Sequence, residues 1–323
     1  MTRHRLGSVA ASLVFGAGLV APTPALAAAA GAAPLRIMPL GDSITVGSGS
    51  PGRNGWRADL QRRLRAAGVR TDFVGSARAG TTGDRDHEGH GGWTIEQLAG
   101  VVGRSLATYR PDVVLLHAGT NNITRGDDPV VAAGRLSALI DRVRAGAPDA
   151  DVYVATIVGT AVAAEVPANH AYNALIPAVV RARGPRVHLV DQSVVTGVDI
   201  YDRHHPNRFG YRKMAYTWYE AIRGTLHPEW PGTGNPFRAT SAHLCHAQSR
   251  TARDCRTWHL RRVTVTSPDG RSGTERRWQT RRTVTVRVWA WTPGHYREYA
   301  GTRRWVPGRY VLRKLRTARW SST

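Results

Sequence analysis

The sequence predicts an α/β protein in which a parallel sheet is covered by helices on both faces. Short runs of apolar residues, each of strand length, recur between residues 35 and 190, and the segments between them carry apolar residues at helical spacing. A strand of a parallel sheet is buried on both faces and is therefore almost continuously apolar. The alternation of such strands with amphipathic helices predicts a three-layer α/β/α sandwich.

Five apolar runs are expected to form the sheet, at residues 35–40, 71–74, 113–117, 152–158 and 187–190. Helices are expected at residues 57–67, at residues 94–109, and around Leu136, Leu139, Ile140 and Val143, whose spacing places them on one helix face. In open sheets of this kind, ligands bind beyond the carboxyl ends of the strands, so polar residues that directly follow a strand are candidate site residues.

Residues 1–27 have the layout of a secretory signal peptide. Arg3 and Arg5 precede an apolar stretch, and the small residues Ala25 and Ala27 form a cleavage-site pattern. The apolar stretch contains Gly and Pro and falls short of the roughly 20 residues that span a bilayer, which argues against the alternative of an N-terminal membrane anchor. We expect the cleaved protein to be secreted to the extracellular space, without a membrane span.

The charge is distributed unevenly along the chain and predicts a domain boundary. Residues 236–323 contain 19 Arg and one Lys against four acidic residues, which is +16 of the total net charge of +22. Residues 35–235 are nearly balanced, at +4. A stretch rich in Pro and Gly separates the two regions and cannot continue a helix. We expect a catalytic domain at residues 35–230, a linker at 231–236 and a basic C-terminal region at 237–323.

The C-terminal region has two alternative interpretations. Residues 262–266 and 283–291 alternate at period two, with a turn signal at 268–270, which predicts a small β-rich module. Six of the ten Trp lie in this region among its arginines, which would suit contact with anionic polymers or cell-wall material. The region is poor in Leu, Ile and Phe, so the alternative is a solvated, partly disordered extension of unknown role.

The chain has two cysteines, Cys245 and Cys255, and both lie in the basic region. Disulfides persist in the oxidising environment that a secreted protein meets. We therefore expect Cys245 and Cys255 to form a disulfide across a short loop, and expect neither to take part in catalysis.

Two segments far apart in the chain carry the parts of a serine esterase. Gly-Asp-Ser-Ile-Thr at residues 41–45 follows the first expected strand, and Asp202, His204 and His205 lie far downstream. A Ser hydroxyl is a weak nucleophile until a base takes its proton, and a carboxylate orients that base. These residues predict Ser43 as the nucleophile, with His205 or its neighbour His204 as the base.

The succession of motifs resembles the SGNH hydrolases, the GDSL-type esterase superfamily. Besides the two segments above, the chain contains HEGHGGWT at residues 87–94 and GTNN at residues 119–122. The similarity covers roughly residues 35–226 and is closest in pattern to the branch that contains the family 3 carbohydrate esterases, which are acetylxylan esterases. It implies a flavodoxin-like sheet and no cofactor.

The resemblance also implies a role for each site residue. The superfamily pattern of Asp, two variable residues, His and Pro fits Asp202 and His205, which makes His205 the base and Asp202 its partner. The oxyanion hole is implied to consist of the backbone N–H groups of Ser43 and Gly92 and the side-chain amide of Asn121. Gly92 fits the pattern better than its neighbouring glycines because a hydroxyl residue follows it by two positions.

One position departs from the superfamily pattern. Relatives commonly have Asp after the oxyanion Asn, whereas this chain has Asn122. Because that position is not the oxyanion donor, we expect the chemistry to survive. The substitution bears instead on the hydrogen bonds that a carboxylate would make there.

A run of acidic residues and histidines between Asp84 and His90 could suggest a metal site. It lacks the helical H-E-x-x-H spacing and contains no Cys, so we expect it to shape the substrate loop instead, with no catalytic metal. The sequence thus predicts a secreted serine esterase that removes small acyl groups, acetyl above all, from polysaccharides such as xylan. The alternatives are a lipase or lysophospholipase of the same superfamily, and a protein that binds polysaccharide or anionic polymer on an esterase fold.

Overall fold

The computed structural model describes residues 33–239, 241–247, 252–266, 271–292, 295–299, 302–306 and 309–322. The expected signal peptide at residues 1–27 and the turn signal at 268–270 lie outside the described residues. Among the helices that the structure describes, none has both the length and the apolar character needed to cross a bilayer.

The central sheet has the flavodoxin-like strand order. Its parallel strands run in the order β2 (Thr71–Phe73), β1 (Leu35–Gly41), β5 (Val113–His117), β6 (Asp151–Ala155) and β7 (Val187–Val190). The end of β1 also pairs in parallel with β4 (Asp86–Gly89), and β3 (Ala77–Arg78) pairs antiparallel with β4. The chain adds β2 on one side of β1 and β5 on the other, so the strand order reverses at β1. Such a switch point is where open sheets of this kind bind ligands.

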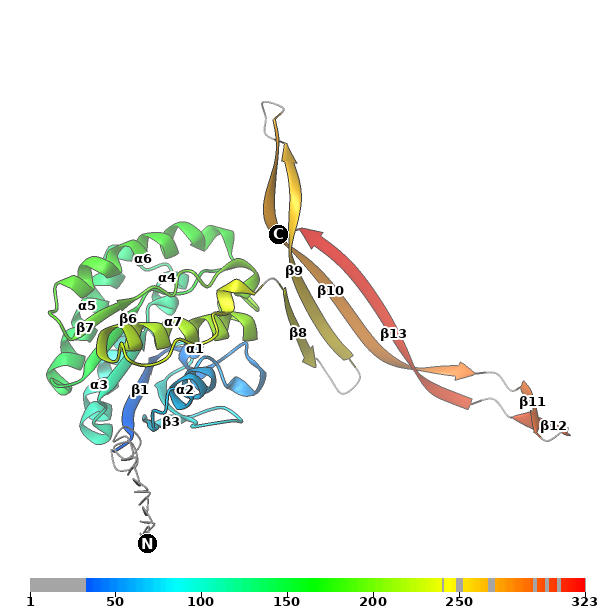
Figure 1. Ribbon diagram of the computed structural model, residues 1–323, viewed down its shortest axis with the longest axis horizontal. Helices are drawn as coiled ribbons and strands as arrows, with labels where there is room; N and C mark the ends of the chain where they lie inside the picture. The colour runs from blue at the N-terminus through cyan, green and yellow to red at the C-terminus, as the bar shows by residue number, and fades with distance from the viewer. Residues whose placement is uncertain are drawn as a thin grey trace, which may run out of the picture. The chain divides into compact units, whose positions relative to one another are not determined.

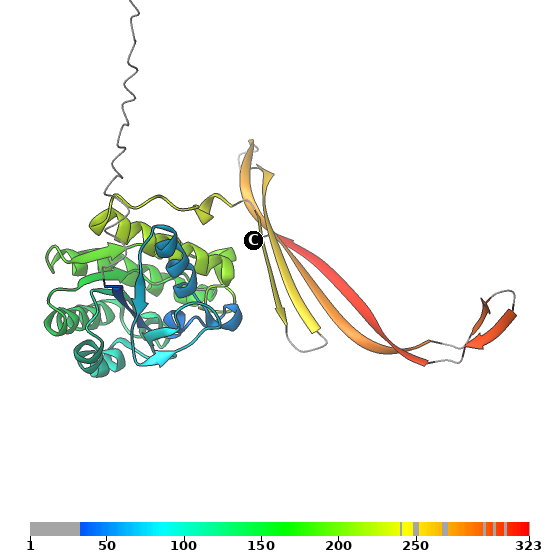
Figure 2. The same ribbon diagram turned by 60° about the horizontal axis from the view of Figure 1, so that its bottom comes forward.

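Helices cover both faces of this sheet (Figures 1 and 2), as the sequence predicts. One face is covered by α3 (Ile95–Tyr109), α5 (Pro129–Gly146) and α6 (Val166–Arg181), and the other by α2 (Arg57–Ala66) and α7 (Arg208–Leu226). The α3 helix begins one residue later than predicted, because Thr94 is its N-cap and forms a capping box with Gln97.

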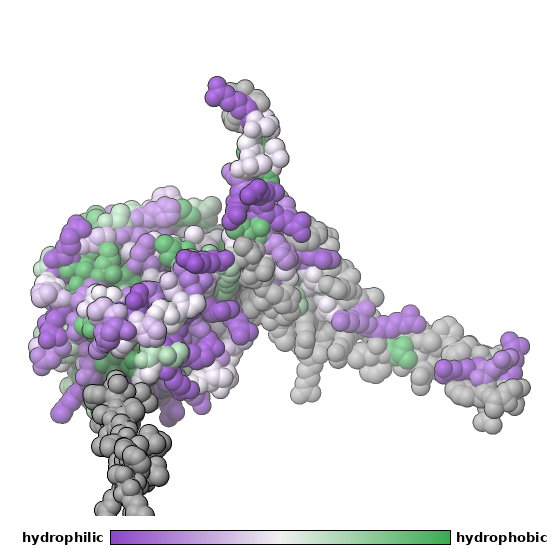
Figure 3. Space-filling view, in the orientation of Figure 1, coloured by the Kyte–Doolittle hydropathy of each residue, from purple (hydrophilic) through white to green (hydrophobic). Residues whose placement is uncertain are grey.

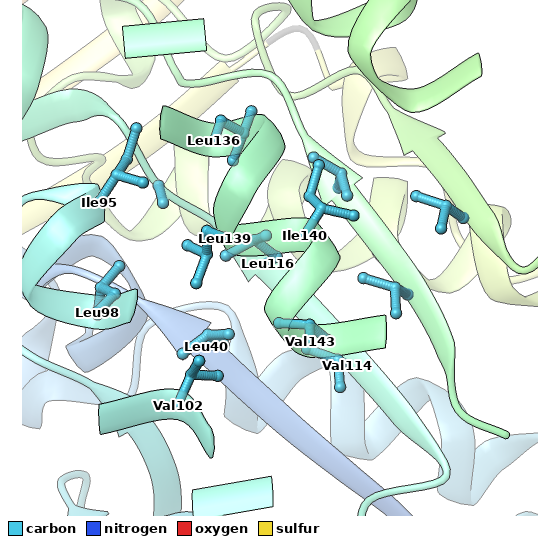
Figure 4. Close-up of a cluster of buried hydrophobic side chains, with 14 of the residues drawn as sticks. Leu40, Ile95, Leu98, Val102, Val114, Leu116, Leu136, Leu139, Ile140 and Val143 are labelled. Carbon is cyan, nitrogen blue, oxygen red and sulfur yellow. The ribbon is translucent and has the colours of Figure 1, made fainter. Parts of the chain in front are cut away.

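Two apolar clusters fix the helices to the sheet. Figure 4 shows one of them, in which Leu40, Val114 and Leu116 of the sheet meet side chains of α3 and α5. On the other face, the rings of Trp56 and Trp218 lie 5.6 Å apart between α2 and α7, and both are fully buried. Each such buried side chain contributes roughly 1.5–3 kcal/mol relative to an exposed one, so the faces of the sheet set the positions of the helices.

The β6 strand is shorter than predicted and ends at Ala155 instead of residue 158. Beyond it, the backbone N–H and C=O of Ile157 both bond to the side chain of Asn173 on α6. The apolar residues up to Val158 are buried, but they line the loop that leaves the sheet. The sequence predicted a strand there because these residues are apolar, and an apolar run by itself does not distinguish a buried strand from a buried loop.

The expected linker has no regular structure at residues 231–235, yet it is bound to the α/β domain. Arg63 of α2 donates to the Thr233 hydroxyl at 2.6 Å and to the Gly234 carbonyl at 3.0 Å. The Tyr219 hydroxyl of α7 donates to the Pro231 carbonyl at 2.7 Å. The segment is therefore part of the surface of the domain rather than a free tether.

The C-terminal region forms antiparallel strands in the described residues. β13 (Arg309–Ser322), β10 (Ser272–Thr292), β9 (Ala252–Thr266) and β8 (Ser241–Ala247) pair in that order, and β11 (His295–Tyr299) pairs with β12 (Thr302–Val306). The β-rich interpretation describes these residues better than a disordered extension does.

The two cysteines lie on neighbouring strands of this sheet. Cys245 of β8 is directly opposite Cys255 of β9, and Cys255 is in a disulfide. The register places the two residues on neighbouring strands, and their pairing with each other stays a prediction of the sequence.

Candidate active site

The nucleophile turn is built at the carboxyl end of β1. Asp42 is the N-cap of the short helix α1 (Ser43–Val46), and its Oδ1 accepts a 2.8 Å hydrogen bond from the N–H of Ile44. Ser43 is therefore the first helical residue, at a strand end as predicted. A Cβ at Gly41 would lie 2.1 Å from the carbonyl oxygen of His117 on β5, so only Gly allows β1 to approach β5 this closely.

The buried guanidinium of Arg57 stabilises this turn by hydrogen bonds to backbone carbonyl groups. Arg57 of α2 donates to the carbonyl groups of Thr45 and Val46 at 3.0 and 3.2 Å. It also donates to the carbonyl groups of three loop residues, Arg53, Ala79 and Arg85. Burial lowers the pKa of Arg57 to about 10, which still leaves it charged at neutral pH. The carbonyl groups at the end of α1, which the helix itself leaves unsatisfied, are thereby bonded.

The structure brings Ser43, His205 and Asp202 into one hydrogen-bonded line. Ser43 Oγ lies 2.8 Å from His205 Nε2, and His205 Nδ1 lies 2.8 Å from Asp202 Oδ2. The competing residue, His204, points elsewhere and pairs with Glu165. The choice of His205 over His204, which the family pattern implied, agrees with this geometry.

The loop that carries the base is closed on itself. Ile200 and Pro206 form a β-bridge, and the Tyr201 N–H donates to the carbonyl of His205 at 2.7 Å. Asp202 Oδ1 accepts from the N–H groups of both His204 and His205, each at 2.9 Å. The same carboxylate therefore shapes the loop through one oxygen and orients the imidazole through the other.

The pair formed by Asp202 and His205 has opposite pKa shifts. Partial burial raises the pKa of Asp202, but hydrogen bonds, beginning with that from the His205 ring, outweigh it and hold the pKa well below its ordinary value. The hydrogen bond to Asp202 raises the pKa of His205 above its ordinary value of 6.5, and burial opposes this only in part. The carboxylate thus makes the imidazole a stronger base.

Of the two other predicted oxyanion donors, Gly92 lies on a loop next to Ser43, and Asn121 lies on the short helix α4 (Thr120–Thr124). A Cβ at Gly91 would be 3.9 Å from the Ser43 Cβ, and the next residue, Gly92, has φ = +81°, which favours Gly. Asn121 donates one amide hydrogen to the carbonyl of Trp93 at 2.8 Å. An amide has two N–H groups, so the other remains for a substrate oxygen.

The helix that carries Asn121 also holds the Gly92 loop. Arg125, at the end of α4 (Thr120–Thr124), donates to the Gly92 carbonyl at 2.6 Å. The N-cap of this helix is Gly119, where φ is +117° and a Cβ would lie within 2.5 Å of the Tyr172 ring. Sequence reasoning missed Arg125, because nothing in the local pattern distinguishes it from the other exposed arginines.

Asn122, which replaces the usual Asp of the family, is buried and fully bonded. Its Oδ1 accepts from the N–H of Ile95, the first residue of α3, at 2.9 Å. Its Nδ2 donates to Glu96 at 3.0 Å and to Asp127 at 2.8 Å. Partial burial raises the pKa of Glu96, but hydrogen bonds, first that from Asn122, outweigh it and lower the pKa. Glu96 and Asp127 both present carboxylate oxygens to position 122, and the Nδ2 of Asn122 supplies the hydrogen-bond donor that both require.

The acidic loop is organised by hydrogen bonds within itself. Glu88 is buried and accepts from the N–H and hydroxyl of Ser76 and from His90, whose ring stacks on Trp93 at 4.0 Å. Burial lowers the pKa of His87 to about 3, so this residue is neutral. Within the described residues, no three His, Cys, Asp or Glu side chains converge as a metal would require. The loop supports Trp93, beside the predicted oxyanion hole.

Comparison with known proteins decides the family. Residues 40–213 match the family model described as GDSL-like Lipase/Acylhydrolase, which is more than half of the chain. The chain belongs to this family. A family 3 carbohydrate esterase from Clostridium thermocellum matches with 35% identity and a TM-score of 0.55, over 62% of this chain and all of that one. A family 3 carbohydrate esterase from Talaromyces cellulolyticus matches with 26% identity and a TM-score of 0.52, over 59% and 97%.

The similarity also extends to a much longer protein. A multidomain esterase from Ruminococcus flavefaciens is 32% identical over 254 residues, which is 69% of this chain. The chain spans only 32% of the length of that esterase. These matches confirm the superfamily and the fold that the sequence predicts. They agree with the relation to carbohydrate esterases.

The pKa shift of His205 predicts the pH dependence of ester hydrolysis. His205 acts as a base only when neutral, so kcat/KM should rise with pH through a pKa above 6.5. Asp202→Asn removes the partner that raises this pKa. The acid limb should then move to lower pH, and the plateau should fall by about a hundredfold. Rate profiles with p-nitrophenyl acetate measure both, and an unmoved limb would exclude Asp202 as the partner.

The two adjacent histidines should differ in their effect on turnover. His205→Ala removes the base that contacts Ser43 and should lower kcat by about 10³-fold or more. His204→Ala leaves that contact in place and should lower kcat by only about tenfold. Steady-state kinetics on the two purified variants decide the point. A larger loss in His204→Ala would mean that the wrong histidine has been assigned.

The family-typical residue should be harmful at position 122. Asn122→Asp replaces a buried donor by an acceptor that faces Glu96 and Asp127, so stability should fall by about 1–3 kcal/mol. Adding Asp127→Asn supplies a donor and should restore most of the loss. Urea unfolding of the single and double variants measures the difference. An unchanged or raised stability in Asn122→Asp would refute this explanation of the departure from the family.

Proposed function

We propose that the protein is a serine esterase that hydrolyses acetyl and other small acyl esters on polysaccharides such as xylan. The line of hydrogen bonds from Ser43 through His205 to Asp202 carries this proposal. The polysaccharide substrate is supported by the relatives, two of which are described as family 3 carbohydrate esterases.

The geometry supports a two-step mechanism. His205 Nε2 takes the proton of Ser43 Oγ as that oxygen attacks the ester carbonyl. The resulting oxyanion is stabilised by the N–H groups of Ser43 and Gly92 and by the amide of Asn121. His205 then gives its proton to the departing alcohol, which leaves the acyl group on Ser43. A water molecule, deprotonated by His205, attacks this acyl-enzyme. His205 then returns the proton to Ser43 Oγ as the bond to the acyl group breaks, and the acid is released. Asp202 stays ionised throughout and stabilises the imidazolium.

We also propose that the protein acts outside the cell. The basic, apolar and small-residue sections of residues 1–27 follow the order of a secretory signal peptide. The disulfide at Cys255 suits an oxidising environment. Comparing the N-terminal sequence of protein recovered from culture medium with that of the full chain would test this, and a medium without the protein would contradict it.

The competing functions differ in what they require of the site. A lipase or lysophospholipase of the same family would need the same three catalytic residues and a longer acyl site. A protein that only binds polysaccharide would not need a Ser43 hydroxyl at hydrogen-bond distance from an imidazole, and the intact line therefore favours an enzyme.

The substrate range and the nucleophile can be tested together. The wild-type protein should release acetate from acetylxylan and should hydrolyse p-nitrophenyl acetate faster than the octanoate ester. Ser43→Ala should lower turnover by several orders of magnitude with no change in the unfolding transition. A preference for the octanoate ester would favour a lipase. Full activity in Ser43→Ala would refute the mechanism.

We propose further that the basic C-terminal strands bind an anionic polysaccharide. In the hairpin of β9 and β10, Arg262 lies directly opposite Arg276, and Arg261 directly opposite Arg277. All four are exposed, and hydrophilic residues dominate the coloured part of these strands in Figure 3. Like charges at directly opposed positions repel each other in a sheet. Neighbouring residues of a strand point to opposite faces, so the two pairs lie on opposite faces of the hairpin, and Arg277 already pairs with Glu275. A polyanion would relieve the repulsion of the pair on the face that it contacts.

Binding should depend on these four arginines rather than on net charge alone. A variant with all four changed to Gln should lose about tenfold or more in affinity for polygalacturonate, whereas its kcat on p-nitrophenyl acetate should not change. Wild-type binding should weaken steeply above about 0.1 M salt. A control with the same charge change carries Gln at four exposed arginines of the α/β domain, Arg65, Arg104, Arg181 and Arg212. Equal losses in both variants would contradict binding by these particular arginines.

A further inference from the structure

We propose that Glu165 and His204 form a positioning pair that holds the loop bearing Asp202 and His205 against the loop that follows β6. His204 Nε2 lies 2.7 Å from Glu165 Oε2. The side chains are 23% and 16% exposed, so solvent competes only weakly for the contact. The inference rests on the esterase function proposed above and assigns roles to two residues outside the catalytic line.

Glu165 is itself fixed before it meets His204. Its Oε2 accepts a 2.8 Å hydrogen bond from the hydroxyl of Thr160, and Thr160 Oγ1 accepts in turn from the N–H of Val162. Glu165 ends the short 3₁₀ helix Ala163–Glu165, directly before α6. These hydrogen bonds give the carboxylate a defined position, as a residue that positions another must have.

The backbone of the catalytic loop meets the same segment. The carbonyl of Arg203 accepts from the N–H of Ala161 at 2.8 Å and lies 3.2 Å from Thr160 Oγ1, whose single hydrogen is donated to Glu165. The contact between His204 and Glu165 is thus the side-chain part of an interface that also has a backbone part. Together they fix both the place of the loop and its rotation.

Displacement of His204 would act directly on the catalytic line. The N–H groups of His204 and His205 share one acceptor, Asp202 Oδ1. If the His204 backbone moves, the carboxylate that orients His205 loses one of its two fixed points. A misplacement of about 1 Å in a reacting group can cost a hundredfold in rate. The pair therefore affects turnover without contact with substrate.

The pair also faces the element that carries Asn121. Glu165 and His204 line a small pocket together with Thr120 and Ile123 of α4. The base loop, the segment after β6 and the oxyanion-bearing helix meet at this pocket. A displacement of any one of these three elements would therefore alter the contacts of the other two at this pocket.

Three variants test whether the pair acts as a unit. Glu165→Ala and His204→Ala should each lower kcat on p-nitrophenyl acetate by about tenfold with KM changed less than about twofold. The double variant should lose no more than either single one, because the second change removes a contact that is already broken. Losses that multiply in the double variant, or an unchanged kcat in either single variant, would overturn the proposal.

A conservative variant and a spectroscopic measurement address loss of structure. Glu165→Gln keeps an acceptor for Thr160 and His204, so it should retain at least about a third of wild-type kcat. It also serves if Glu165→Ala does not fold. In Glu165→Ala, the low-field proton resonance of the hydrogen bond between His205 Nδ1 and Asp202 should broaden or shift. Equal kcat losses in the Gln and Ala variants would contradict positioning by hydrogen bonds.

The fold offers a matched control at the opposite end of the sheet. His188 Nε2 lies 2.8 Å from Asp151 Oδ1, with side chains 17% and 12% exposed. Asp151 begins β6, far along the strand from the catalytic edge. His188→Ala should lower the unfolding temperature but leave kcat unchanged, and a similar kcat loss there would show that any such pair acts through general stability. Inactivity of the wild-type protein on all esters would instead refute the proposed function.

Discussion

The hydrogen bond between Ser43 Oγ and His205 Nε2 joins residues that are 162 positions apart in the sequence. Contacts on both sides of this bond hold the two atoms 2.8 Å apart. On the nucleophile side, Asp42 caps α1 and the buried Arg57 binds its last carbonyl groups. On the side of the base, Asp202 shapes its loop and orients the imidazole. A serine hydroxyl gains its reactivity from the base beside it, so activity depends on the precision of both supports.

The predicted oxyanion donors Asn121 and Gly92 are both positioned by one short helix, α4. α4 presents Asn121, and its end fixes the Gly92 loop through Arg125. The neighbouring Asn122 is part of the same arrangement. Here the negative charge lies on Glu96 and Asp127, which Arg135 bridges, and the residue at position 122 supplies the amide donor between them. What the arrangement requires is that each donor meets an acceptor, and the amide of Asn122 meets this requirement between two carboxylates.

The candidate catalytic residues and most of the net positive charge lie in different parts of the chain. The α/β domain carries the reaction at nearly balanced charge, whereas the C-terminal strands hold most of the excess of arginine. In the proposed function this division lets one part hold a polymer while the other removes its acyl groups. A substrate held by a charged surface near the enzyme reaches the active site at a higher local concentration, and the gain falls with ionic strength. Salt should therefore weaken polymer binding without altering the catalytic line.

By itself, the sequence determined the layered α/β fold, the place of Ser43 at the end of the first strand and the set of candidate residues, because apolar periodicity and short motifs are local properties. The sequence pattern alone left His204 and His205 as rivals, and only the folded loop shows which ring reaches Ser43. The same holds for Glu165, Arg57 and Arg125, whose partners lie far away in sequence or are backbone carbonyl groups. Such contacts leave no periodic trace. The end of β6 was also decided in three dimensions, because Asn173 from another element binds the backbone of Ile157 and takes it out of the sheet.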